Sequence, residues 1–140
     1  MNRFQLTFGA LVLAQVAHSI EEYVSRLWES FPPALLLAGL ISPDLRKNFL
    51  LLNILFVGFG VWCYVWPVRR QWKAAIGLAW LWAGIELVNG IGHSLWSLWR
   101  FGYSPGVITA PLLVILALYM MAQLRSAKRA NIQMVRLERF

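Results

Sequence analysis

The chain has 140 residues, of which 59% are hydrophobic and 14% charged, with a formal net charge of +7. This composition is too apolar for an ordinary soluble domain, and the length suffices for one small domain. The single cysteine, Cys63, excludes an intrachain disulfide and a thiolate cluster within one chain. Because the basic residues lie between apolar segments rather than on one polar face, we expect a membrane protein and no nucleic-acid partner.

The first apolar stretch covers residues 4–23, which is the length a helix needs to cross about 30 Å of hydrocarbon. Arg3 precedes it as in a signal peptide, but the Ala-x-Ala pattern of a cleavage site is missing before His18. We therefore expect a retained transmembrane helix. Residues 31–41 are also apolar, but they are too short to span and begin beside two prolines, which favours a re-entrant or interfacial segment.

The rest of the chain predicts three further spans and a basic tail. Ser42, Pro43 and Asp44 are typical of a helix start, with Ser42 as the N-cap and Pro43 at the first helical position. We therefore expect an all-α fold, a single four-helix membrane domain over residues 1–140 with a short segment capping one end. The predicted spans cover residues 49–66, ended by Pro67, then 74–99 and 107–124, and the tail covers 125–140.

Basic residues gather on one side of this predicted topology. The N-terminus, the loop between the second and third spans and the C-terminal tail carry one, three and five Lys or Arg residues, against four on the other side. The positive-inside rule then places both termini in the cytoplasm. We expect a multi-pass protein of the plasma (inner) membrane.

An imidazole and two carboxylates stand together at the end of the first predicted span: His18, Glu21 and Glu22. At about 100° per residue, the two glutamates straddle His18 within an arc of about 100°, so the three side chains share one helix face. Ionisable groups at membrane depth are costly, and this marks the cluster as a candidate functional site.

A second polar cluster, Glu86, Asn89 and His93, interrupts the third predicted span and also shares one helix face. The predicted topology places it in the same leaflet as the first cluster. Because exposing carboxylates to lipid is costly, we expect the two polar faces to enclose a polar chamber. Tyr103 would reach its rim, and Asn53 could add a further polar group. Polar groups that merely hold helices together are the structural alternative.

Two histidines with two or three carboxylates are a ligand set for a divalent metal such as zinc or iron. The simplest arrangement is a mononuclear site of His18, His93 and either Glu22 or Glu21, with the other glutamate as general base. Glu86 is a further candidate ligand, although about 10 Å along the helix separates it from His93. Three side chains complete the candidate site: Tyr103 to hydrogen-bond substrate, and Asn89 and Asn53 to bind it or to support the ligands.

The residues leave three functional classes open. The first is a metal-dependent membrane enzyme that acts on a lipid or other apolar small molecule entering laterally. The second is a metal-free lipid isomerase or cyclase, in which a buried Glu donates a proton and a neighbouring group removes one. The third is non-enzymatic, a proton or cation relay or a membrane binding protein. Four spans are few for a pore unless the chain forms a homo-oligomer.

Three short motifs give the chain a resemblance to a known family. The HXXEE motif is present from His18 to Glu22, NXXXH from Asn89 to His93, and YXPG from Tyr103 to Gly106. Their presence and order resemble the HXXEE-domain membrane proteins. The resemblance implies a small multi-span membrane protein whose motif residues form an enzymatic or metal site, and it leaves the reaction open.

Overall fold

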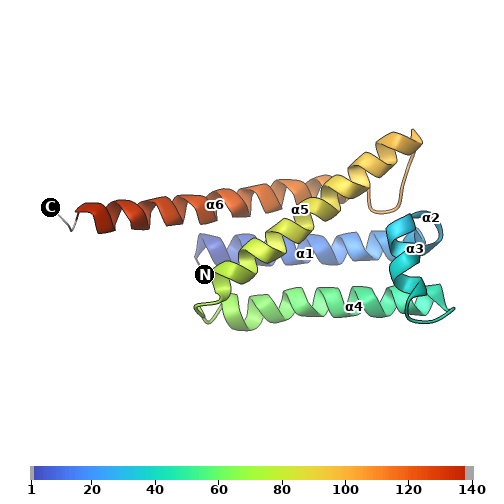
Figure 1. Ribbon diagram of the computed structural model, residues 1–140, viewed down its shortest axis with the longest axis horizontal. Helices are drawn as coiled ribbons and strands as arrows, with labels where there is room; N and C mark the ends of the chain where they lie inside the picture. The colour runs from blue at the N-terminus through green and yellow to red at the C-terminus, as the bar shows by residue number, and fades with distance from the viewer. Residues whose placement is uncertain (1, 138–140) are drawn as a thin grey trace.

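The structure, a computed structural model, describes residues 2–137, with side chains through residue 127. Over this range the chain is all-helical and has no strand. In Figure 1, α1 and α4 lie side by side and α5 crosses obliquely between α4 and α6. The helices are α1 (Arg3–Val24), α2 (Leu27–Ser30), α3 (Pro32–Gly39), α4 (Leu45–Cys63), α5 (Ala75–Arg100) and α6 (Ala110–Leu137), and a π-helical turn η1 (Tyr64–Val68) extends α4.

The segment between α1 and α4 closes one end of the bundle, which we call the α2–α3 end (Figure 1). The chain leaves α1 through Arg26, whose φ of 56° is left-handed, and Pro32 begins α3 at the first helical position. Trp28, Ala38 and Phe49 form a small apolar core here, separate from the main one. The eight-residue α3 agrees with the short capping segment that the sequence predicts.

The start of α4 differs from the prediction by two residues. Asp44, not Ser42, is the N-cap, and its side chain accepts a hydrogen bond from the Lys47 backbone N–H at 3.1 Å. The Ser42 hydroxyl instead donates to Asn48 Oδ1 at 2.9 Å, which ties the capping segment to α4. At the N-terminus of α4 the Asp44 carboxylate is also stabilised by the helix dipole.

Pro67 does not end the second long helix at residue 66. A wider turn absorbs it: the Arg69 N–H reaches the Tyr64 carbonyl and the Trp72 N–H reaches the Pro67 carbonyl, both across five residues. A π-helical turn tolerates the missing proline N–H, and the helix continues to Val68 before Gln71 turns the chain at a φ of 53°.

The last two long helices also differ in their bounds. The helix predicted over 74–99 spans Ala75–Arg100, while the last begins at Ala110 rather than residue 107. That helix continues through most of the predicted tail to Leu137, and residues 138–140 lie outside the described part.

Trp82 is the centre of the main core, which lies away from the α2–α3 end. Its indole stacks on Phe56 with ring centroids 4.8 Å apart, and a Cβ added at Gly60 would lie 2.5 Å from it. A second close approach joins α5 to α6, where a Cβ at Gly90 would lie 2.8 Å from the Ala110 carbonyl oxygen. Gly60 lets α4 pack closely against Trp82 of α5, and Gly90 lets α5 pack closely against the start of α6.

By length and composition, three helices of the described chain can cross a membrane: Leu45–Val68, Ala75–Arg100 and Ala110–Ala127. The first helix is 22 residues long. Its polar residues Gln15, His18 and Glu22 are buried, and they lower its apolar character. The structure therefore supports three of the four predicted spans. The predicted span over residues 4–23, which is α1, is not among them.

Candidate functional site

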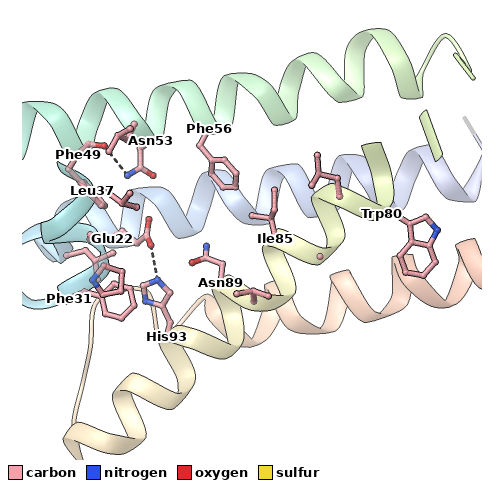
Figure 2. A pocket seen from close by; sticks show the side chains of 17 residues that line it. Glu22, Phe31, Leu37, Phe49, Asn53, Phe56, Trp80, Ile85, Asn89 and His93 are labelled. Carbon is pink, nitrogen blue, oxygen red and sulfur yellow. Dashed lines mark hydrogen bonds and ion pairs between the residues drawn. The ribbon is translucent and has the colours of Figure 1, made fainter. Parts of the chain in front are cut away.

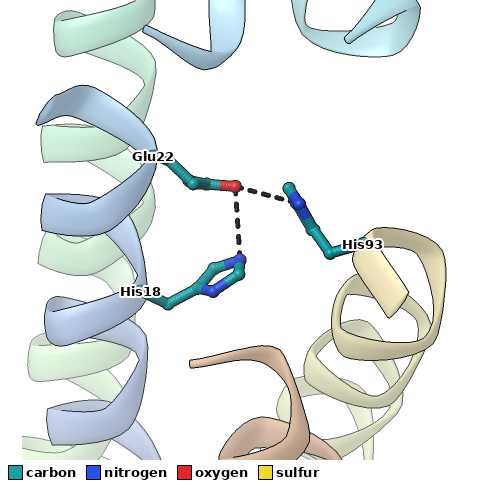
Figure 3. A group of neighbouring side chains, drawn as sticks. All are labelled: His18, Glu22 and His93. Carbon is teal, nitrogen blue, oxygen red and sulfur yellow. Dashed lines mark ion pairs between the residues drawn. The ribbon is translucent and has the colours of Figure 1, made fainter. Parts of the chain in front are cut away.

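His18, Glu22 and His93 come together from two helices, as Figure 3 shows. Glu22 Oε1 lies 3.3 Å from His18 Nε2 on the preceding turn of α1 and 3.0 Å from His93 Nε2 on α5. The two imidazoles meet edge to face, with ring centroids 4.7 Å apart. All three residues are buried, and their ligand atoms lie within 4.8 Å of one another. We call this set the His–Glu–His group.

Both histidines direct their Nδ1 atoms away from the group. His93 Nδ1 lies 2.7 Å from the Pro105 carbonyl oxygen, which can only accept, so Nδ1 carries the proton. His18 Nδ1 lies 2.7 Å from Thr109 Oγ1, whose own proton goes to Glu21 Oε2 at 2.6 Å. His18 Nδ1 therefore donates as well, and the neutral form of each ring presents an Nε2 lone pair to Glu22.

Three electron-pair donors facing one another in a buried place repel unless a cation stands among them. Protonation of a histidine is one way to supply that cation, and a metal ion is another. Histidines that bind metals typically donate the second ring N–H to a carbonyl or carboxylate, as His93 does directly and His18 does through Thr109. The group could therefore hold a metal ion with two nitrogen ligands and one oxygen ligand.

Gly106 lets the loop before α6 pass directly beside both imidazoles. Its φ is +89°, and an added Cβ would lie 2.7 Å from His93 Nδ1 and 2.8 Å from His18 Cε1. Only glycine satisfies both the backbone conformation and the space. The position of the two histidines therefore requires a glycine at the end of the YXPG motif. Residues of all three motifs are in contact at this site.

Glu21 points to a different partner from Glu22. Its Oε1 accepts from the Ile108 N–H at 3.1 Å and from the Tyr103 hydroxyl at 3.2 Å, and its Oε2 accepts from the Thr109 N–H at 2.9 Å and the Thr109 hydroxyl. These backbone N–H groups lie just before α6, where a negative charge is stabilised by the helix dipole. Glu21 thus caps α6 from α1 and orients Thr109 toward His18.

The structure places the remaining predicted residues around the group rather than in it. Glu86 is fully buried, but neither carboxylate oxygen has a hydrogen-bond partner among the described residues, and it is not one of the three clustered ligands. Tyr103 is exposed at the rim, where its hydroxyl lies 2.8 Å from Ser25 Oγ. Asn89 and Asn53 line a pocket next to the group.

That pocket is the second part of the site (Figure 2). It has a volume of about 900 Å³ and lies between α3, α4 and α5. Glu22 and His93 form part of its wall at the α2–α3 end, and Trp80 lies at the opposite end. His18 does not line it. The pocket therefore gives access to one side of the His–Glu–His group.

Sequence reasoning missed Thr109, and it included Pro105 and Gly106 only as members of the YXPG motif, without a role for either. Their roles depend on a loop that returns to α1 from far along the chain, and helical periodicity carries no signal for such a contact. One signal was present: Gly106 closes the YXPG motif, and Thr109 carries a hydroxyl three residues later at the start of a predicted span.

Fold and site together define a class: an all-helical chain with helices able to span a membrane and a buried group able to hold a metal. A family model described as "Protein of unknown function with HXXEE motif" matches residues 9–121. The chain belongs to this family, as its motifs indicate. No curated protein and no solved structure matches the chain.

Proposed function

We propose that this protein is a four-span membrane enzyme that binds one divalent metal ion, zinc or iron, in the His–Glu–His group and acts on a lipid or apolar small molecule. The surface of α1 supports its assignment as the fourth span. Leu6, Leu13, Ile20 and Val24 are exposed, while five polar residues of the helix are buried: Thr7, Gln15, His18, Ser19 and Glu22. An apolar exterior around a polar interior suits lipid rather than water, since large apolar surface patches on soluble proteins are rare.

One observation carries the metal proposal: two Nε2 lone pairs and one carboxylate oxygen converge, and each Nδ1 is already held by an acceptor. Two nitrogens and one carboxylate are the protein ligands of many catalytic zinc sites and of non-haem iron sites. Both kinds of site keep coordination positions open for a substrate. A bound ion would supply Lewis acidity to an oxygen of the bound molecule.

Glu21 and Glu22 have different roles in this proposal. Glu22 is the ligand, since its Oε1 lies between the two imidazoles. Glu21 is a positioning residue rather than the general base, because its four hydrogen bonds occupy both of its oxygens. Through Thr109 it keeps the His18 ring in the orientation that presents Nε2.

The test is the metal content of the full-length protein purified in detergent. We expect one zinc or iron per chain by elemental analysis, and none in the double variant His18→Ala, His93→Ala. Glu86→Gln is the matched control, since it changes a buried carboxylate of the same bundle that lies outside the group, and we expect it to keep the metal. Wild-type protein that folds but binds neither metal on titration would refute the metal proposal.

Thr109→Val should weaken metal binding without removing a ligand. Valine keeps the shape and the backbone N–H bond to Glu21 but loses the hydroxyl that accepts from His18. Supporting partners of metal-bound histidines contribute about 10–100-fold in affinity, so we expect a loss in that range. Competitive titration with a metal indicator measures it. Ser25→Ala, which removes only a rim contact of Tyr103, should leave the affinity unchanged.

A further inference from the structure

The pocket beside the His–Glu–His group is long and polar at one end only. Trp80 and His93 both line it, and thirteen residues of α5 separate them, about 20 Å along the helix axis. Between them the walls are apolar apart from two asparagines, with Phe56 on α4 facing Ile85 on α5 (Figure 2). This shape fits an extended apolar chain whose polar end lies beside Glu22 and His93.

The polar end is covered by apolar side chains, and among the described residues it has no basic side chain to hold a phosphate. Phe31, Pro33 and Leu37 of the capping segment cover it, and Phe31 packs against the His93 ring at 5.1 Å between centroids. None of the described Lys and Arg side chains lines the pocket. The proposed metal ion, its charge partly neutralised by the Glu22 carboxylate, would be the sole counter-charge for a phosphate there, and this favours a neutral oxygen group over an anionic one.

We propose that the pocket binds a neutral single-chain lipid with an oxygen at one end, of the fatty-alcohol or fatty-aldehyde class, head toward Glu22 and His93 and tail toward Trp80. This inference rests on the proposed function in one respect, that the oxygen meets the metal. Asn89, which lies on α5 one turn before His93, is placed to hydrogen-bond that oxygen. The size of the pocket is within the range of small-molecule sites.

Gly84 sets the length of chain that fits. It lines the pocket, and an added Cβ would meet no atom within 4 Å, so a larger side chain there would extend into the pocket rather than into the protein. Gly84 lies nine residues from His93, about 13 Å along the axis, so a leucine would block the distal third of the pocket. Gly77 on the same helix is equally open but does not line the pocket, which makes it the matched control.

The experiment uses long-chain primary alcohols with a photoreactive diazirine, in full-length protein in nanodiscs, read by peptide mass spectrometry. A diazirine at the tail should label the α5 segment around Trp80, and one beside the hydroxyl should label the capping segment around Phe31. Excess unlabelled long-chain alcohol should compete. In Gly84→Leu, alcohols longer than about 13 Å should compete at least tenfold more weakly, because two or more of their methylenes are no longer buried. Gly77→Leu should leave their competition unchanged.

Three results would overturn the inference: labelling that does not saturate, equal labelling by a two-chain phosphatidylcholine probe, or identical chain-length profiles for Gly84→Leu and Gly77→Leu. Repeating the labelling experiment on the His18→Ala, His93→Ala variant separates the proposed metal from the proposed ligand of the pocket. Saturable labelling without any metal in the wild-type protein would refute the metal and keep the pocket's ligand. Stoichiometric metal with unsaturable labelling would refute the ligand and keep the metal.

Discussion

Gly106→Ala is expected to disrupt the His–Glu–His group and to lower the stability of the whole bundle. The added methyl would lie 2.7–2.8 Å from atoms of both imidazoles, and the φ of +89° would be strained for alanine. A strained backbone and an overfilled core each cost about 1–3 kcal/mol, so we expect a loss of about 2–6 kcal/mol. Metal should no longer bind stoichiometrically, because relief of the clash must move His18 or His93 away from Glu22.

The same loop offers the control for this substitution. At Gly102 an added Cβ would meet only the Arg100 carbonyl oxygen, at an ordinary 3.9 Å, and we expect Gly102→Ala to change stability by less than about 0.5 kcal/mol. Thermal unfolding in detergent and metal analysis on both variants provide the comparison. Equal behaviour of the two variants would mean that the loop does not hold the histidines in place.

Helical periodicity explains how much of this architecture could be predicted from the sequence. Long apolar stretches predict long helices, and most of their bounds agree within a few residues, including those shifted by Pro67 and Asp44. The exception is the last helix, which continues past the predicted end at residue 124 to Leu137. The expected meeting of the two polar faces also follows from topology: His18 and Glu22 lie on α1 near the α2–α3 end, and His93 lies on α5 at that same end.

The sequence could not predict which partner each glutamate of the two clusters reaches. That choice depends on how the helices are oriented against one another. Glu21 and Glu22 are neighbours on one face, yet one reaches the start of α6 and the other reaches His93. Glu86 shares a face with His93, but two helical turns place it beside the apolar core rather than in the group. Periodicity locates a face, whereas a ligand set requires the packing of three helices.

Replacing the whole His–Glu–His group by apolar residues should make the metal-free protein more stable. Removing charged and polar groups from water carries a desolvation penalty that their mutual attraction barely offsets. Proteins in which such groups are replaced by apolar side chains of similar volume are often more stable by about 1–4 kcal/mol. We therefore expect His18→Leu, Glu22→Met, His93→Leu to unfold at higher temperature than wild-type protein kept in a chelator. That triple variant should bind no metal.

The neighbouring glutamate supplies a control of opposite sign. Glu21→Met leaves four donors around α6 without their acceptor, and each hydrogen bond to a charged group contributes about 1.5–3 kcal/mol, so we expect a loss of about 3 kcal/mol or more. Unfolding of both variants in the same detergent and chelator measures the contrast. If the triple variant loses as much stability as Glu21→Met, the His–Glu–His group stabilises the packing of α1 against α5, and its presence is explained by structure alone. A stabilised triple variant would instead mean that the chain keeps these three residues at the expense of its own stability, which is the mark of a functional site.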